Sequence, residues 1–138
     1  MAISQGSLEI RTNPKSFLDI TSRVQEFVSN SNIVNGVCHL FIKHTSASLV
    51  IQENYDPSVR QDFETIFSNL APEDFPYIHN MEGKDDMPAH IKSGLLGAEL
   101  TLPIRDGELM LGIWQGLYLG EHRNHAGPRT VIVTVQGS

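Results

Sequence analysis

Three histidines, His44, His79 and His90, are the side chains of this sequence that could assemble into a site for chemistry. Two or three neutral imidazoles with a carboxylate suit Zn²⁺ or another divalent transition metal, and leave a position open for water or a substrate. Glu121 and Asp86 are the carboxylates that we consider as members of such a site. Because ten residues between His79 and His90 form no recognised metal-ligand spacing, the metal site is a hypothesis that rests on residue types.

Each of these side chains also has a structural interpretation, which the sequence leaves open. His44 closes the apolar face of a strand and could be a hydrogen-bonded core residue. His79 could be an exposed loop residue, and His90 a residue that caps a helix. Asp85 and Asp86 could supply capping charge before a proline instead of a catalytic or supporting role.

The last third of the chain carries further polar side chains with two interpretations. Arg129 could pair with a substrate phosphate or with a surface carboxylate. In a continuous strand, Gln115 and Glu121 would share a face with several leucines, where an amide and a carboxylate need partners. His122 and His125 fall in a polar turn, so we expect both to be solvated.

The first half of the chain predicts a helix and several strands, one of which positions His44. We expect strands over residues 7–12, 17–20, 37–44 and 49–51, and a helix from Thr21 or Ser22 to Val28. In the third strand, alternation places Cys38, Leu40, Ile42 and His44 on one face. His44 is therefore predicted to lie at the edge of the core.

Two helices and a long loop are predicted to position His79 and His90. Asp56-Pro57 starts a helix in which Val59, Phe63, Ile66, Phe67 and Leu70 form one apolar stripe. The irregular segment that follows runs to about Met87 and carries His79, and a loop of that length is more often functional than idle. A second helix is predicted from Pro88 to Gly97, with His90 in its first turn.

The remainder of the chain predicts a β-meander. We expect a strand over residues 98–104, a hairpin turn at Asp106-Gly107, a return strand over 109–121, a turn over 123–128 and a last strand over 129–135. The glycines of the return strand favour bulges, and each bulge would reverse the faces of the residues after it.

Composition excludes several classes of protein. The chain has 138 residues and a net charge of -6 with ten scattered basic residues, which argues against nucleic acid as a partner. The single Cys38 excludes an internal disulfide and suits a core residue in a reducing compartment. Neither a secretion signal nor a membrane span is found, so we expect a cytoplasmic protein with no membrane partner.

Eight short segments, each weak alone and specific together, resemble the YjbQ-like family, whose members are described as secondary thiamine-phosphate synthase enzymes. The segments are HTSASL (44–49), EN (53–54), His79 with EG (82–83), DDMPAHIKS (85–93), LG (111–112), WQG (114–116), LGEHR (119–123) and VQG (135–137). The resemblance spans essentially the whole chain, so residues 1–138 are expected to form one such domain.

The resemblance implies a compact α+β subunit with mainly antiparallel β-sheet or sandwich and about three helices, assembled as a homotrimer. It implies a pocket in which His44, His79 and His90 hold a divalent metal, zinc or similar. His44, Glu121 and Asp86 are the expected catalytic residues. The expected ligand-binding residues are Ser46, Asn54, Gln115 and Arg129. The turn over residues 123–129 departs from the acidic or glycine-rich turn of many family members, which leaves its role open.

The activity that the resemblance implies joins hydroxymethylpyrimidine diphosphate to thiazole phosphate and releases pyrophosphate. A small phosphorylated molecule is therefore the expected substrate, with a cation to neutralise the leaving group. One alternative is a metal-dependent hydrolase of a small phosphorylated or heterocyclic metabolite. Another is a non-catalytic trimer whose pocket binds an anion or other ligand.

Overall fold

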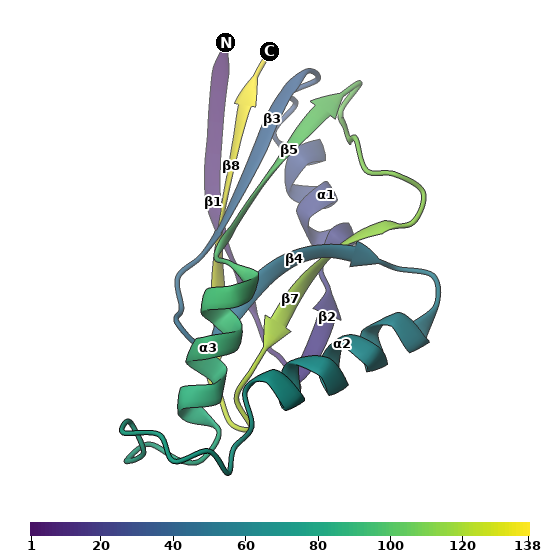
Figure 1. The fold of residues 1–138 in the computed structure, drawn as a ribbon. Helices are drawn as coiled ribbons and strands as arrows, with labels where there is room; N and C mark the ends of the chain where they lie inside the picture. The colour runs from purple at the N-terminus through teal and green to yellow at the C-terminus, as the bar shows by residue number, and fades with distance from the viewer.

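Two antiparallel sheets form the framework of the computed structural model, which describes residues 1–138 (Figure 1). The larger sheet has the order β1-β8-β3-β5-β6, and the smaller has the order β2-β7-β4. The strands are β1 (Ala2–Ile10), β2 (Ser16–Asp19), β3 (Gly36–Ile42), β4 (Ala47–Glu53), β5 (Glu99–Arg105), β6 (Glu108–Leu109), β7 (Gln115–Glu121) and β8 (Arg129–Gly137). Both chain ends lie side by side because β1 pairs with β8 along its whole length.

The core lies between these sheets and the first helix, α1 (Thr21–Asn30). Alternation along β3 buries Cys38, Leu40 and Ile42, as the sequence predicts, and β8 buries every second residue in the same way. Val24 and Val28 of α1 are fully buried against them. Cys38 is thus a core residue, and burial raises the pKa of its thiol to about 11.

Helices α2 (Pro57–Leu70) and α3 (Asp86–Leu96) lie at the end of the molecule opposite to the termini (Figure 1). Helix α2 begins as predicted: the Asp56 carboxylate accepts a hydrogen bond from the Ser58 backbone N–H at 2.9 Å, and Pro57 is the first helical residue. Helix α3 ends at Gly97, whose φ of 103° suits glycine. Residues 71–85 connect the two helices.

Three predicted boundaries were wrong, and each matters for the site. Strand β3 ends at Ile42, so His44 lies beyond the strand. Helix α3 starts at Asp86, two residues before Pro88, which places His90 beyond the first turn. The single return strand over 109–121 is split, because residues 110–114 leave the larger sheet before β7 joins the smaller one; Ile113 is 83% exposed as a result.

The fold class is α+β with three helices and antiparallel strands, as predicted. No helix is both long enough and apolar enough to cross a membrane.

We expect Gly107→Ala to lower the free energy of unfolding by about 1 kcal/mol. Gly107 has a φ of +76° in the β5–β6 turn, where a Cβ meets no other atom within 4 Å, so backbone strain is the only cost. Gly94→Ala is the matched control, because Gly94 lies in α3 with equally open surroundings and should gain about 0.5–1 kcal/mol. Urea unfolding of both variants measures the difference, and equal effects of the same sign would contradict the expectation.

Candidate metal centre

Helix α3 and the loop before it bring four ligand-type side chains together. Asp86 and His90 are four residues apart in α3 and therefore share one face. The loop adds His79 and Glu82, and one ligand atom from each of the four residues lies within 4.8 Å of the other three. His79 Nε2 lies 2.6 Å, and His90 Nε2 3.1 Å, from the same oxygen of Asp86, Oδ2.

The hydrogen bonds of His90 fix which of its nitrogens faces the cluster. His90 Nδ1 lies 2.8 Å from the backbone carbonyl oxygen of Thr45, which can only accept, so Nδ1 carries a proton. Neutral His90 then turns the Nε2 lone pair toward the Asp86 carboxylate, and two electron-rich atoms face each other at 3.1 Å. A cation between them, or a proton on Nε2, is required.

Arg123 holds the cluster from the side of the β7–β8 turn. Its guanidinium donates to Asp85 Oδ2 at 3.0 Å through Nε and to Asp86 Oδ1 at 2.5 Å through Nη1. A third hydrogen bond runs from Nη2 to the backbone carbonyl of Glu82 at 3.0 Å. Asp86 therefore presents one oxygen to the histidines, while Arg123 occupies the other.

These contacts set the protonation of the cluster. Burial raises the pKa of the Asp86 carboxyl, but hydrogen bonding to His79 and the charge of Arg123 act in the opposite direction, and that pKa lies below its usual value. The hydrogen bond to Asp86 raises the pKa of His79. Asp86 is thus an ionised carboxylate, as a metal ligand must be.

The structure places His44 in a second polar cluster, and the partners of His44 there are Arg129 and Thr130. His44 Nε2 accepts a hydrogen bond from the Thr130 backbone N–H at 2.9 Å, so that lone pair is occupied. Arg129 Nη1 lies 3.3 Å from Nδ1, and burial followed by the charge of Arg129 lowers the pKa of His44. Within this chain, the candidate metal centre consists of His79, Glu82, Asp86 and His90 and does not include His44.

Glu121 and Arg129 form a buried ion pair at the centre of the second cluster. The Arg129 guanidinium donates to both Glu121 oxygens, at 2.8 and 2.5 Å, and also to Ser46 Oγ at 2.9 Å. Thr12 Oγ1 donates to Glu121 at 2.6 Å. Of the two interpretations of Arg129, pairing with a carboxylate is the one that the structure shows, although that carboxylate is buried instead of exposed.

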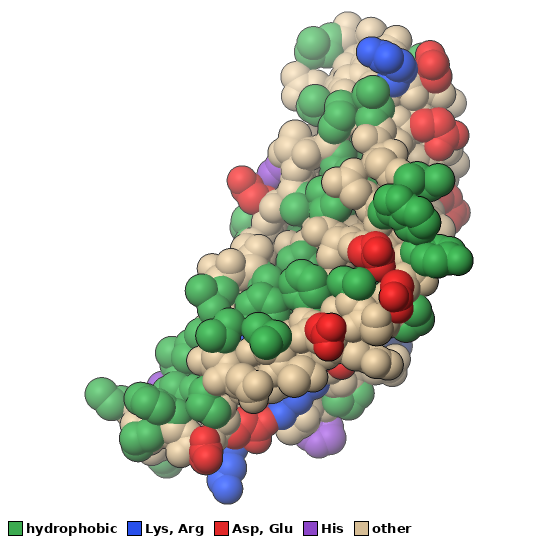
Figure 2. All heavy atoms as spheres, turned by 45° about the vertical axis from the view of Figure 1, so that its right-hand side comes forward, with side chains coloured by type: hydrophobic (Ala, Val, Ile, Leu, Met, Phe, Trp, Pro, Cys, Tyr) green, Lys and Arg blue, Asp and Glu red, His purple; other side chains and the backbone are tan.

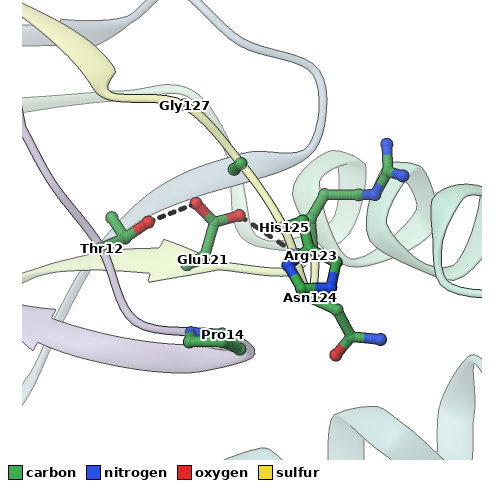
Figure 3. Close-up of a pocket in the computed structure, with 8 residues that line it drawn as sticks. Thr12, Pro14, Glu121, Arg123, Asn124, His125 and Gly127 are labelled. Atoms are coloured by element: carbon green, nitrogen blue, oxygen red, sulfur yellow. Dashed lines mark hydrogen bonds between the residues drawn. The ribbon is translucent and has the colours of Figure 1, made fainter.

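Figure 3 shows the surroundings of Glu121, whose carboxylate points toward Thr12 and the backbone of Arg123. The Arg123 backbone N–H donates to Glu121 at 3.1 Å while its side chain holds Asp85 and Asp86, so one residue contacts both clusters. The cavity drawn there measures about 440 Å³. Its lining is Thr12, Pro14, Glu121, Arg123, Asn124, His125, Ala126 and Gly127.

Asn54 and Gln115 lie in neither cluster. Asn54 donates to the Gln115 backbone carbonyl at 3.2 Å, and the Gln115 amide oxygen accepts from the Gly112 backbone N–H at 2.8 Å. The expectation that His122 is solvated was wrong, because it is 4% exposed and hydrogen-bonded to Ser48.

Sequence reasoning did not select Glu82 or Arg123 as site residues. Glu82 lies four residues before Asp86, the same interval that separates Asp86 from His90, and this regular spacing of ligand-type residues could have indicated it. Arg123 carries no such local pattern, because its partners lie 37 and 38 residues away along the chain.

Known proteins match this chain over nearly its whole length. The family model described as "UPF0047 protein YjbQ-like" matches residues 6–138. The UPF0047 protein YjbQ of Salmonella typhimurium is 47% identical over 134 residues, covering 96% of this chain and 97% of its own length. A UPF0047 protein of Synechocystis is 48% identical, covering 96% and 91%.

Solved structures share the fold over nearly the whole chain. A YbjQ-like protein of Sulfolobus solfataricus superposes with a TM-score of 0.92 at 28% identity, covering 99% of each chain. A conserved hypothetical protein of Thermus thermophilus gives 0.85 at 35% identity, covering 95% of this chain and 99% of its own. The match of the family model and the level of identity together show that this chain belongs to the UPF0047 YjbQ-like family.

Proposed function

We propose that His79, Glu82, Asp86 and His90 bind one divalent transition metal, zinc or a similar ion. The observation that carries this proposal is the orientation of His90, whose Nε2 faces Asp86 while Nδ1 donates to the Thr45 carbonyl. Histidines that bind metals commonly donate their other N–H to a carbonyl or carboxylate in this way. Two imidazoles with two carboxylates also fit the ligand preferences of such ions.

We further propose that the site serves a thiamine-phosphate synthase type of transfer. The thiazole nitrogen forms a bond to the pyrimidine methylene carbon, and the bond from that carbon to the diphosphate oxygen breaks to release pyrophosphate. A divalent metal, when bound, neutralises charge on the leaving diphosphate. Arg123 holds the Asp86 carboxylate in place, and its contact with Glu82 fixes the loop.

A cavity beside His79 supports a flat heterocycle as the substrate. The cavity measures about 130 Å³ and is lined by His79, Lys84 and the rings of Phe75 and Tyr77, whose centres lie 4.9 Å apart. Aromatic rings stack on flat heterocycles, and the Lys84 ammonium suits a phosphate. These residues would position the pyrimidine next to the cluster.

Elemental analysis of protein purified without an affinity tag is the first test, followed by product analysis with both substrates. We expect about one metal per chain, and thiamine phosphate formed with an equal amount of pyrophosphate. His79→Ala should lose the metal and the synthase activity. His39→Ala should keep the metal and the activity, because His39 is an exposed histidine paired with Glu99. Wild-type protein that contains no metal and takes up no Zn²⁺, Ni²⁺ or Mn²⁺ would refute the metal centre.

A metal-dependent hydrolase is the second candidate, favoured by the exposure of one side of the cluster. The His79 and Glu82 side chains are 46% and 64% exposed, so water reaches the ligand atoms directly. The same product analysis separates the two reactions, because a hydrolase consumes one phosphorylated substrate without the other. Anion binding without turnover of any phosphorylated substrate would favour the non-catalytic alternative.

Arg123→Gln is expected to weaken Zn²⁺ binding about tenfold with the fold intact. The substitution removes the bond to Asp86 Oδ1 and lets the carboxylate turn away from the histidines. Chelator competition measures the affinity, and Arg11→Gln is the control, because Arg11 is exposed and makes no hydrogen bond. Equal affinity of wild type and Arg123→Gln would show that Asp86 is positioned without Arg123.

We propose a cytoplasmic homotrimer as the working form. Figure 2 shows a face on which apolar side chains gather over much of the surface. Strongly exposed apolar side chains include Tyr55, Ile78, Met81 and Ile113, at 73%, 100%, 91% and 83%. Contiguous exposed apolar surface marks interaction sites, and further copies of this chain are the occupants that we propose for the face in Figure 2. Light scattering should give three times the chain mass of 15.3 kDa.

A further inference from the structure

A small cavity outside the metal centre lies between β2, α2, α3 and the end of β7. Its volume is about 20 Å³, room for little more than one water-sized atom. The lining residues are Lys15, Ser16, Phe17, Glu64, Phe67, Ser68, Lys92, Glu121 and His122.

Lys92, a largely buried residue, lines this cavity, and its ammonium has no protein partner. Its side chain belongs to a residue that is 6% exposed, and its ammonium makes no hydrogen bond and no ion pair. The other charges nearby are already paired: Lys15 with Glu73, and Glu121 with Arg129. Because a charge on a largely buried residue is stabilised by a nearby charge of opposite sign, the cavity beside the Lys92 ammonium is a position that favours an anion.

The remaining carboxylates do not balance that charge. Asp85 accepts hydrogen bonds from Arg123 and from the Asn124 backbone N–H. Glu64 lines the cavity from α2, but it lies beyond ion-pair distance of Lys92. The α2 residues that line the cavity make no side-chain hydrogen bond or ion pair, so this wall holds no carboxylate fixed against Lys92.

His122 provides a second polar group at the cavity. Its Nε2 lies 2.8 Å from Ser48 Oγ, and its other ring nitrogen has no partner. Burial lowers the pKa of His122 to about 4, so the ring is neutral and one nitrogen carries a proton. Gly120 makes this placement possible, because a Cβ there would lie 2.5 Å from Ser48 Oγ and 3.0 Å from the His122 ring.

We propose that this cavity binds a small anion, either a halide or one oxygen of a phosphate-type oxyanion, against the ammonium of Lys92 and the ring N–H of His122. In the tautomer in which the Ser48 hydroxyl donates to Nε2, the proton of His122 is on Nδ1 and is free to donate to the anion. The small volume excludes larger organic anions from the inner position. This inference is independent of the proposed metal centre.

Crystals soaked in sodium bromide test the site directly through anomalous scattering. We expect one bromide peak per chain within about 3.5 Å of Lys92 Nζ, lost in Lys92→Met and retained in Lys15→Met. Lys15→Met is the matched control, because it removes a lysine that lines the same cavity but is already paired with Glu73. No peak in wild type, or a peak that persists in Lys92→Met, would overturn the proposal whether or not the variant folds well.

Calorimetric titration with inorganic phosphate, in a buffer whose only other anion is gluconate, separates the two sources of the anion. Phosphate binding weakened at least tenfold in Lys92→Met, and unchanged in Lys15→Met, assigns a phosphate oxygen to the cavity. Bromide bound in crystals without measurable phosphate binding assigns a halide. If wild type and Lys92→Met bind phosphate equally well, the phosphate site lies outside this cavity. If no bromide peak is found at Lys92 either, the proposal is refuted.

Discussion

Asp86→Asn is expected to lower the Zn²⁺ content of the purified protein to less than a tenth of the wild-type value. Asp86 is the one member of the cluster that contacts both histidines, at 2.6 and 3.1 Å, and it is 2% exposed. An amide keeps the shape of the side chain but removes the negative charge that a divalent cation requires. Elemental analysis after dialysis against Zn²⁺ and then against metal-free buffer measures the effect.

Asp74→Asn is the matched control, because Asp74 is an exposed aspartate of the same loop without hydrogen-bonded partners, and it should retain wild-type zinc. His90→Gln provides a second test that leaves the Arg123 contacts of Asp86 intact. Circular dichroism of each variant separates loss of metal from loss of fold. Wild-type zinc content in folded Asp86→Asn and His90→Gln would rule out the proposed cluster as the metal centre.

Glu121→Gln is expected to lower the free energy of unfolding by about 3–5 kcal/mol, the range for breaking a buried ion pair. The side chains of Arg129 and Glu121 are 6% and 1% exposed, so the substitution leaves the guanidinium without its counter-charge away from water. Urea unfolding measures the loss. Glu99→Gln is the control, because its pair with His39 is exposed and should change stability by less than about 1 kcal/mol.

The same ion pair predicts the acid sensitivity of the protein. Burial raises the pKa of the Glu121 carboxyl, but hydrogen bonds from Arg129, Thr12 and the Arg123 backbone outweigh it and hold that pKa below its ordinary value of 4.5. The unfolded chain therefore takes up this proton first as pH falls. The stability that ionised Glu121 contributes is complete above pH 4.5, and it is lost as pH falls through the lowered pKa. Unfolding midpoints between pH 7 and 3 should show a smaller acid slope for Glu121→Gln, and parallel slopes would contradict this assignment.

The sequence by itself determined the elements whose causes are local. The N-cap of Asp56, Pro57 and the apolar stripe after them define α2, and alternation defines the inner face of β3. Asp106-Gly107 gives a turn in which both residues have positive φ. These features follow from propensities and from neighbours within a few residues, so a single sequence contains what fixes them.

The candidate site could be predicted only in part. His79, His90 and Asp86 were selected by residue type, and the structure brings them together because Asp86 and His90 share one helix face and the loop returns to it. His44 was grouped with them by residue type and by the family resemblance. Its partner is the Thr130 backbone N–H, 86 residues along the chain, and pairing of β3 with β8 decides that contact.

Only the tertiary structure decided the partners of the buried polar groups. Arg123 reaches Asp85 and Asp86, Arg129 pairs with Glu121, His122 is buried beside Ser48, and Lys92 faces a cavity. The split of the predicted 109–121 strand has the same origin, because β6 and β7 belong to different sheets. The physical reason is that a side chain in water has no preferred partner. Burial removes the water, and the register of distant strands then determines which group replaces it.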